Sequence, residues 1–221
     1  MSYLANFQQK YNEIEVYDVG SHQGRWSVGI TLGAHSSSFM IKIFTFDPVY
    51  EPKELQHLLQ SEGLFESSKI KHMHTPVAIS QNLAFMYFDT HENRKSENPI
   101  HKVVPCKRIE EIIEFNQEPA TGKTIRVLKV DIEGMEFELL KDPTDLSVWQ
   151  IIQFESSKYT SEFSSVRELM DLFANDFTLF VVSQSGLVMM TNSLIDLIQT
   201  SGITNLVAIS NDLIDIKFLP I

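Results

Sequence analysis

The sequence contains a single cysteine, Cys106, among 221 residues. One cysteine excludes an internal disulfide and a cysteine-rich zinc site, and we interpret Cys106 as a structural thiol on a strand. The sequence also lacks any run of about 18 consecutive apolar residues, which a membrane-spanning helix requires. Because the first residues also lack the basic and apolar regions of a signal peptide, we expect a soluble, cytoplasmic protein without a membrane span.

Positively charged residues are few. The chain has 18 lysines and arginines against 29 acidic residues, so its formal net charge is −11. This balance repels a phosphate backbone at long range, so we expect no nucleic-acid partner. Hydrophobic residues make up 43% of the chain, which is enough to build one core. We therefore expect a single domain over residues 1–221, with a short amphipathic helix at residues 1–12.

Hydrophobic periodicity predicts strands and helices in alternation, which is typical of an α/β fold. The strand at 83–89 is predicted to form a hairpin with the strand at 74–80. Residues 90–101 are polar and lack periodicity, so they are predicted to be a solvated linker or a lid over the strand ends. The predicted strands are 14–19, 40–47, 74–80, 83–89, 103–106, 127–130, 150–155, 177–183, 187–191 and 205–210, and the predicted helices are 26–32, 51–60, 109–115, 135–140, 164–174 and 193–199.

A turn with two glycines follows the first predicted strand. Asp18, Gly20 and Gly24 have the spacing D-x-G-x-x-x-G between a strand and a helix, which is typical of a nucleotide-binding turn. We expect Gly20 to permit the sharp turn and Gly24 to let helix and strand pack closely, so that free backbone N–H groups face a ligand. The alternative is a glycine turn with a purely structural role.

The second predicted strand ends in an acidic residue, Asp47. A carboxylate at this position can accept hydrogen bonds from both ribose hydroxyls of an adenosine ligand, and such bonds to a charged acceptor are strong. Aspartate is also a preferred residue at helix N-termini, so helix capping is the alternative role.

Residues 126–140, RVLKVDIEGMEFELL, place carboxylates where an apolar strand turns into a helix. Asp131 and Glu133 follow the strand, and Glu155 ends the later strand at 150–155. The carboxyl ends of strands in an open α/β sheet line the ligand crevice, so we expect all three carboxylates to face a ligand there.

Three alternatives remain open for this region. Glu133 and Glu136 would also suit the N-terminus of a helix, as capping acids. Lys129 points the same way as Asp131 along the strand, and a buried ion pair fits it as well as a catalytic role. Oxygen ligands from Asp131, Glu133 and Glu155 would suit Mg²⁺ or Ca²⁺, but their spacing alone does not define a site, and we assign no metal ligands.

Several motifs occur in an order that resembles a known family: YDVGSHQG, FTFDP, PVAIS, CKRIEEII, LKVDIEGMEFELL and IIQFE. The first resembles motif one of class I S-adenosylmethionine-dependent methyltransferases, and the series resembles the FkbM-type methyltransferases. The resemblance implies a Rossmann-like α/β fold, with a mostly parallel seven-stranded sheet, helices on both faces and an antiparallel edge. His22 stands where many members have a glycine, and Ser156 and Ser157 stand where a histidine is common.

The resemblance also implies a function, O-methylation of a hydroxyl on a small molecule or saccharide, with S-adenosyl-L-methionine as cofactor. The alternatives are a divalent cation as an additional cofactor, an inactive binding module with this fold, and an RNA 2′-hydroxyl methyltransferase. The apolar edge at residues 187–190 is a candidate homodimer contact. The implied cofactor-binding residues are Asp18, Gly20, Ser21, His22, Gly24, Asp47, Pro48, Ala78 and Asp131. The implied catalytic residues are Asp131, as general base, and Glu133 and Glu155, which orient the acceptor or share its proton.

Overall fold

The computed structural model describes residues 11–35, 39–61, 69–90, 100–115, 124–132, 136–141, 145–156, 166–191, 194 and 204–214. It divides into two compact units, Met1–Thr124 and Ile125–Ile221. Most of the helices predicted at 1–12 and 193–199 lies outside the described residues, and Tyr11 and Asn12 precede the first strand without helical structure. No helix in the described part of the chain has the length and apolar character needed to cross a bilayer.

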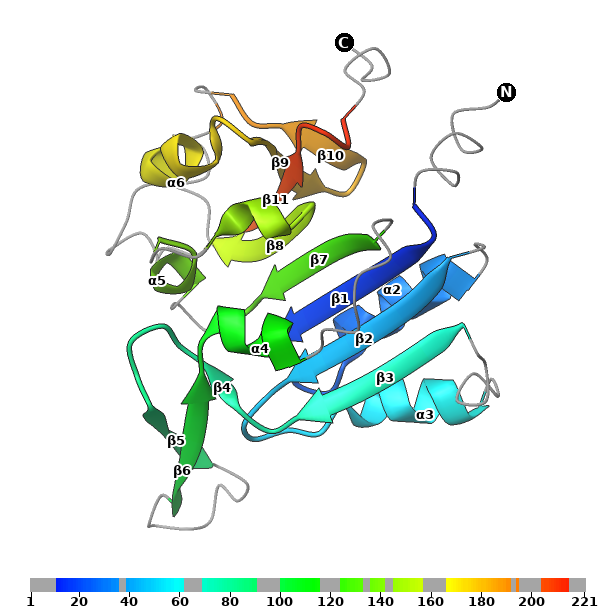
Figure 1. Ribbon diagram of the computed structural model, residues 1–221, viewed down its shortest axis with the longest axis vertical. Helices are drawn as coiled ribbons and strands as arrows, with labels where there is room; N and C mark the ends of the chain where they lie inside the picture. Colours follow the sequence, from blue (N-terminus) through cyan, green and yellow to red (C-terminus); the bar gives the residue numbers. More distant parts are fainter. Residues whose placement is uncertain are drawn as a thin grey trace. The chain divides into compact units, whose positions relative to one another are not determined.

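Three parallel strands form the centre of the first unit. β1 (Glu13–Val19), β2 (Met40–Phe46) and β3 (Ile70–Thr75) pair in that order, so their carboxyl ends lie at one edge (Figure 1). Helices α2 (Arg25–His35) and α3 (Lys53–Ser61) lie on the same face of this sheet. All residues of β1 but one are buried, as expected for a parallel strand that is covered on both faces.

Helix α2 continues beyond its predicted end. The helix predicted over 26–32 stops before Gly33 because a glycine commonly ends a helix, but α2 runs to His35. A glycine ends a helix when it adopts a left-handed conformation, and Gly33 is not among the glycines with positive φ. The prediction therefore mistook a helical glycine for a cap.

The third strand and its partners differ from the prediction. β3 ends at Thr75 because Pro76 has no N–H with which to continue the ladder. β4 (Ala78–Ile79) instead pairs in parallel with β6 (Ile100–Lys107) in a separate three-stranded sheet. β5 (Phe85–Thr90) pairs with β6 in antiparallel fashion. The hairpin predicted between 83–89 and 74–80 is therefore wrong.

The rest of this region agrees better with the sequence patterns. Helix α4 (Ile109–Phe115) has the predicted bounds, and Cys106 lies on β6 as expected. Burial raises the pKa of the Cys106 thiol. In the polar segment predicted at 90–101, Thr90 ends β5 and Ile100 begins β6, while residues 91–99 lie outside the described part.

The second unit contains a mixed sheet with the strand order β10-β9-β11-β8-β7. β7 and β8 are parallel, whereas β11 runs antiparallel to both β8 and β9, and β10 is antiparallel to β9. The expected antiparallel edge is thus confirmed. The expected count of seven strands is not confirmed. Among the described residues, β1 to β3 of the first unit and these five strands of the second add up to eight. The strand bounds are β7 (Thr124–Val130), β8 (Ile151–Ser156), β9 (Phe177–Ser183), β10 (Gly186–Met189) and β11 (Thr204–Ser210).

Aromatic side chains join helices to this sheet. Phe137 of α5 (Glu136–Lys141) lies 6.4 Å from Phe154 of β8, measured between ring centroids. Phe154 stacks on Phe173 of α6 (Val166–Phe173) at 5.9 Å, and Phe173 meets Phe177 edge-on at 5.4 Å. These offset and edge-on contacts are the arrangements that aromatic rings prefer. They place α5 and α6 on one face of the sheet.

The candidate dimer contact at 187–190 is smaller than expected. Leu187, Val188 and Met189 are exposed on β10, but Met190 is buried. Met190 donates its backbone N–H to Leu179 and so belongs to the interior of the unit. The exposed apolar side chains of this edge are therefore those of 187–189.

Two histidines on β3 share one buried hydroxyl. The Thr45 Oγ1 lies 3.0 Å from His72 Nε2 and 3.1 Å from His74 Nδ1, and the Thr45 side chain is fully buried. Burial, and secondarily the charge of His74, lowers the pKa of His72 from 6.5 to about 4. Burial also lowers the pKa of His74, against the opposing effect of Asp47 and Glu51. Both rings are therefore neutral in the folded protein at neutral pH.

The low pKa of His72 makes folding sensitive to acid. The unfolded chain binds a proton near the ordinary pKa of 6.5, whereas the folded chain does so only near about 4. Stability is therefore complete above about pH 6.5 and decreases as the pH falls toward about 4. Between about pH 7 and about pH 5, the wild type should lose about 2 kcal/mol more free energy of unfolding than His72→Gln, measured by urea denaturation. Equal losses would contradict the prediction.

Candidate functional site

The glycine turn after β1 adopts the left-handed conformations that its sequence predicts. Gly20 has a φ of 73° and Gly24 a φ of 81°, so both positions favour glycine. His22 also has a positive φ, 47°, which is uncommon for a residue with a side chain. The turn is thus a tight, specific structure at the carboxyl end of β1.

The backbone amides of this turn are not free, contrary to our expectation. Gly20 N and Ser21 N donate to the Phe46 carbonyl at 2.9 and 3.2 Å, and Gly24 N donates to the Ser21 carbonyl at 2.8 Å. His22 N donates to Asp47 Oδ2 at 2.8 Å. The end of β2 provides the acceptors at Phe46 and Asp47, so the turn is held by the neighbouring strand.

Gly24 allows a close approach, but the partner is a helix and not the predicted strand. A Cβ built on Gly24 would lie 2.9 Å from the Leu55 Cβ and 3.0 Å from the Pro52 Cβ. The Glu54 N–H also donates to the Gln23 carbonyl at 3.0 Å, which ties α3 to the turn. Gly24 therefore lets the start of α3 pack on the glycine turn.

We expect Gly24→Ala to destabilise the protein by roughly 2–4 kcal/mol, because the new methyl group adds a clash to a strained left-handed backbone. Gly29→Ala is the matched control. Gly29 lies in α2, where an added Cβ would meet no atom within 4 Å, so this change should stabilise the helix by about 0.5–1 kcal/mol. Thermal and urea unfolding of the two variants measure both values. A neutral Gly24→Ala would contradict the close packing.

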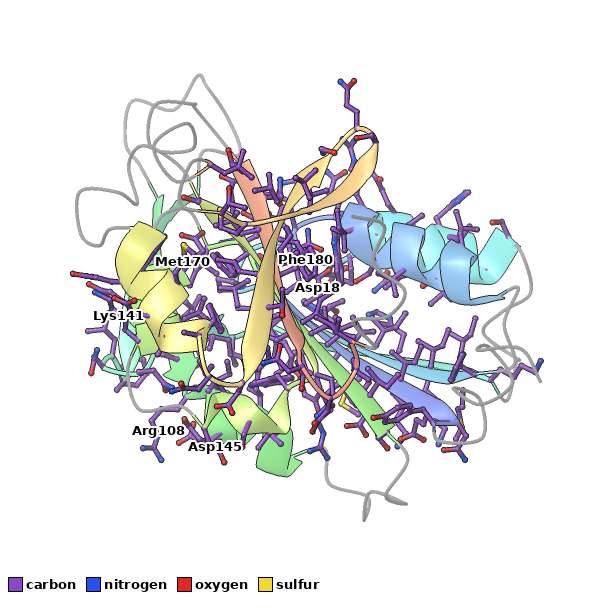
Figure 2. The ribbon with its side chains drawn as sticks, turned by 90° about the horizontal axis from the view of Figure 1, so that it is seen from above. Asp18, Arg108, Lys141, Asp145, Met170 and Phe180 are labelled. Carbon is purple, nitrogen blue, oxygen red and sulfur yellow. The ribbon has the colours of Figure 1, made fainter. Side chains whose placement is uncertain are left out.

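Asp18 and Ser21 are both buried in this region. Asp18 is 0% exposed and accepts a hydrogen bond from the Ser27 hydroxyl of α2 at 2.6 Å. Asp18 is one of the residues labelled in Figure 2. Ser21 is 5% exposed, and its hydroxyl has no hydrogen-bond partner within the described residues. Asp18 thus anchors α2, whereas the Ser21 hydroxyl retains hydrogen-bonding capacity.

Asp47 holds two turns together. Its Oδ2 accepts from His22 N, and its Oδ1 accepts from Val49 N at 2.9 Å and from Tyr50 N at 2.7 Å. The alternative role as a helix cap is not what the structure shows, because α3 begins only at Lys53. A carboxylate has about four acceptor positions, so three bonds leave one for a ligand.

Two exposed aromatic rings and two buried apolar residues complete the group of predicted site residues in the first unit. The exposed His22 ring lies 4.2 Å from the Tyr50 ring, measured between centroids. Pro48 is buried beside Asp47, and Ala78 is 5% exposed on β4, not on the third strand as predicted. Tyr50 was not among the predicted site residues, although its place three residues after a strand-ending aspartate was the available signal.

A second group of candidate residues lies in the second unit. Asp131 follows β7, and its Oδ2 lies 3.3 Å from the Nζ of the buried Lys129, so the ion-pair alternative for Lys129 is present. Glu136 is the first residue of α5 and accepts a hydrogen bond from Ile132 N at 2.8 Å, so an acidic side chain lies at the start of this helix as the capping alternative predicted. Glu133 lies outside the described residues.

Glu155 lies on the strand next to Asp131. The parallel register ends with Val130 of β7 paired with Phe154 of β8, and Asp131 and Glu155 are the next residues along the chain from this pair. Both are partly exposed at the carboxyl ends of their strands. Among the residues that the structure describes, no group of three or more His, Cys, Asp or Glu side chains is arranged to hold a metal ion.

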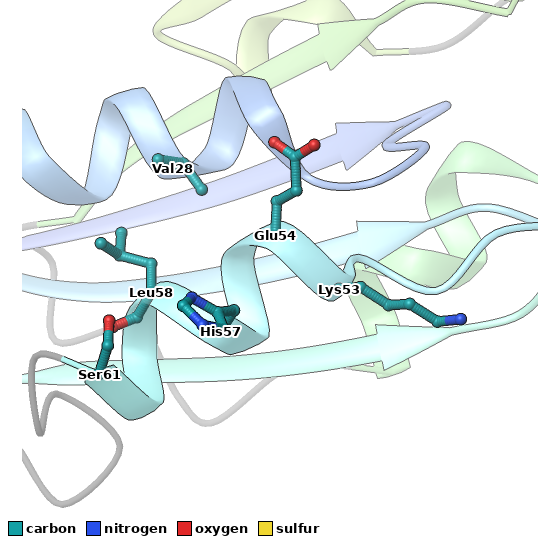
Figure 3. Close-up of a pocket in the computed structure, with 6 residues that line it drawn as sticks. All are labelled: Val28, Lys53, Glu54, His57, Leu58 and Ser61. Atoms are coloured by element: carbon teal, nitrogen blue, oxygen red, sulfur yellow. The ribbon is translucent and has the colours of Figure 1, made fainter.

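A groove of about 520 Å³ runs between α2 and α3 (Figure 3). None of the predicted site residues lines it, although Glu54 at its border forms an ion pair with Arg25 at 2.8 Å. The groove is therefore distinct from the glycine turn. Its lining residues are Val28, Lys53, Glu54, His57, Leu58 and Ser61.

These features define the class of protein. Parallel strands that carry a glycine turn and an acidic residue at their carboxyl ends are typical of α/β proteins whose ligands bind at that edge. The family model described as methyltransferase FkbM domain matches residues 18–179. The chain belongs to the FkbM methyltransferase family, as the order of its motifs predicted.

A solved structure has a similar fold. Methyltransferase FkbM from Methylobacillus flagellatus KT aligns with a TM-score of 0.51 and 16% sequence identity. The alignment covers 88% of this chain but 43% of that one, so this chain spans less than half the length of its structural relative. At this identity the similarity concerns the fold alone. No curated protein matches the chain.

Proposed function

We propose that this protein is an S-adenosyl-L-methionine-dependent methyltransferase that transfers a methyl group to a hydroxyl of a small molecule or saccharide. The observation that carries the proposal is the glycine turn at the end of β1, which is held against β2 by the Asp47 carboxylate. In a family of methyltransferases, such an ordered turn beside an acidic residue supports an intact cofactor site.

The residues of the first unit are suited to an adenosine ligand. Asp47 retains one acceptor position for a ribose hydroxyl. The Ser21 hydroxyl, which lacks a partner within the described residues, can donate to an anionic or carbonyl group. We assign ligand contacts to Asp47, to Ser21 and to the adjacent His22. Ala78 lies on the wall of the proposed site. The residues with supporting roles are Asp18, Gly20, Gly24 and Pro48.

When bound, S-adenosyl-L-methionine supplies a methyl group attached to a sulfonium cation. The protein has to align the acceptor with that carbon and exclude water, which together account for about 7–11 kcal/mol in well-oriented reactions. A hydroxyl acceptor must also lose its proton near the moment of transfer. We assign Asp131 as the general base, and Glu133 and Glu155 as groups that orient the acceptor.

Titration calorimetry and a transfer assay test the proposal. The folded chain should bind S-adenosyl-L-methionine and S-adenosylhomocysteine, and transfer labelled methyl groups to members of a panel of hydroxylated small molecules and saccharides. Loss of transfer on chelation would favour the Mg²⁺ or Ca²⁺ alternative. Cofactor binding without transfer to any acceptor class would favour the inactive binding module, and salt-sensitive transfer to RNA would favour the nucleic-acid alternative. Absence of cofactor binding by folded protein would overturn the proposal.

A further inference from the structure

The last strand in the sheet of the second unit has an open edge. β10 pairs with β9 on one side, and no strand in the described part of the chain pairs with it on the other. Met190 N donates to the Leu179 carbonyl at 2.8 Å, which fixes the alternation of this antiparallel ladder. Residues of such a ladder direct their N–H and C=O groups alternately toward the neighbouring strand and away from it. Leu187 and Met189 therefore direct theirs away from β9, toward the open edge.

The side chains of β10 are apolar and exposed on both faces of the sheet. Leu187, Val188 and Met189 are between 42% and 49% exposed, and Val182, which pairs with Leu187, is 42% exposed. Successive side chains of a strand point to opposite faces, so Val188 lies on one face and its two neighbours lie on the other. The edge thus offers outward backbone groups and apolar side chains together, which is what a strand of another chain needs in order to pair.

β10 also lacks the features that usually prevent an edge strand from pairing, which are charges, prolines and bulges. Charged residues make up 21% of the chain, but residues 177–195 contain none. The strand has no proline, and its register with β9 is continuous, without a bulge. By contrast, the edge strand of the first unit, β3, carries the exposed Lys71. The edge of β10 is therefore unprotected against pairing with another strand.

A second copy of this chain fits the edge for reasons of charge and symmetry. The formal net charge is −11, so two copies repel each other wherever their acidic surfaces meet. A contact confined to an uncharged edge brings no like charges directly opposite each other. A two-fold axis also requires a surface that is complementary to itself, and an antiparallel strand pair with consecutive apolar residues has this property.

We propose that the protein forms a homodimer in which β10 pairs in antiparallel fashion with β10 of a second copy, about a two-fold axis at Val188. In this register Leu187 exchanges backbone hydrogen bonds with the partner's Met189, and Met189 exchanges them with the partner's Leu187. These are the residues whose groups face the open edge. The two copies of Val188 form the non-hydrogen-bonded pair at the axis, where Cα atoms are about 4.5 Å apart.

Sedimentation velocity over roughly 1–300 µM protein tests for the dimer. The wild type should change from monomer to dimer within this range, because a contact through one short strand is small for a protein interface and should be weak. A monomer at every concentration would overturn the proposal and leave the edge to a different partner. Species larger than a dimer would overturn the closed two-fold symmetry.

Val188→Lys and Val188→Glu test the register. Each variant should self-associate at least about tenfold more weakly than the wild type, because it places like charges directly opposite each other at the axis. An equimolar mixture of the two variants should dimerise again, since each lysine then faces a glutamate. Loss of folding in either variant cannot produce this recovery, so the mixture separates pairing at the axis from a structural effect.

Leu172→Lys is the matched control. Leu172 lies on α6, is 38% exposed and does not belong to the edge, so this variant should dimerise as the wild type does. An equal loss of self-association in Leu172→Lys would attribute the effect to added charge in general and overturn the role of the edge. Unchanged self-association of Val188→Lys, or no dimer in the mixture of the two folded Val188 variants, would overturn the pairing about Val188.

Discussion

Replacing Asp131 by asparagine should lower the rate of methyl transfer by about 10²–10⁴-fold, the range expected for loss of a general base. Affinity for S-adenosylhomocysteine should remain within about twofold, because our proposal gives cofactor binding mainly to residues of the first unit. Turnover with a hydroxyl acceptor and calorimetric titration of the same preparation measure the two quantities.

Asparagine is the informative substitution because of Lys129. The Lys129 Nζ lies 3.3 Å from Asp131 Oδ2, and removing the partner of a buried charge can destabilise a protein by about 3–5 kcal/mol. The asparagine side chain keeps an oxygen that can accept from Lys129, so stability should change little. Glu155→Gln is the companion variant. It should lose less turnover than Asp131→Asn, because we assign Glu155 the role of orienting the acceptor and not that of the base. Normal turnover in Asp131→Asn would remove Asp131 from the chemistry.

Replacing Asp47 by alanine should weaken S-adenosylhomocysteine binding by at least about 100-fold and destabilise the first unit by roughly 2–4 kcal/mol. The substitution removes the acceptor of the N–H groups of His22, Val49 and Tyr50. It also removes the group to which we assign the ribose hydroxyls. Calorimetry and urea unfolding measure the two effects.

Asp47→Asn separates the structural effect from the ligand effect. Its amide oxygen can still accept from Val49 N and Tyr50 N, but its NH₂ group cannot accept from His22 N. We therefore expect most of the stability to return while cofactor affinity remains at least about tenfold below that of the wild type. If affinity returned fully with stability, Asp47 would be a turn-forming residue without a direct ligand contact. Weak binding in Asp131→Asn with normal binding in Asp47→Ala would mean that their roles are exchanged.

Local patterns in the sequence predicted several parts of the candidate site correctly. The spacing of Gly20 and Gly24 predicted a sharp turn, and both residues have positive φ. The apolar runs before Asp47 and Asp131 predicted strands that end near each of these carboxylates. These properties depend on neighbouring residues, because side-chain periodicity and backbone conformation are decided over a few positions.

The partners of these groups could not be read from the same patterns. Glycine spacing does not reveal that Phe46 accepts the amides of Gly20 and Ser21, and alternation in β5 does not reveal that β6 is its neighbour. Pairing depends on the register between distant segments, and many pairings satisfy the same hydrophobic pattern.

The amino-acid sequence by itself determined the alternation of strands and helices, the left-handed glycine turn and the acidic residues at strand ends. The tertiary structure alone decided that the turn's amides are occupied, that Asp47 joins the turn to its own loop, and that Gln81 meets Glu110. The physical reason is distance along the chain. His22 and Asp47 are 25 residues apart and Gln81 and Glu110 are 29 apart, so only the packing of the fold brings each donor to its acceptor.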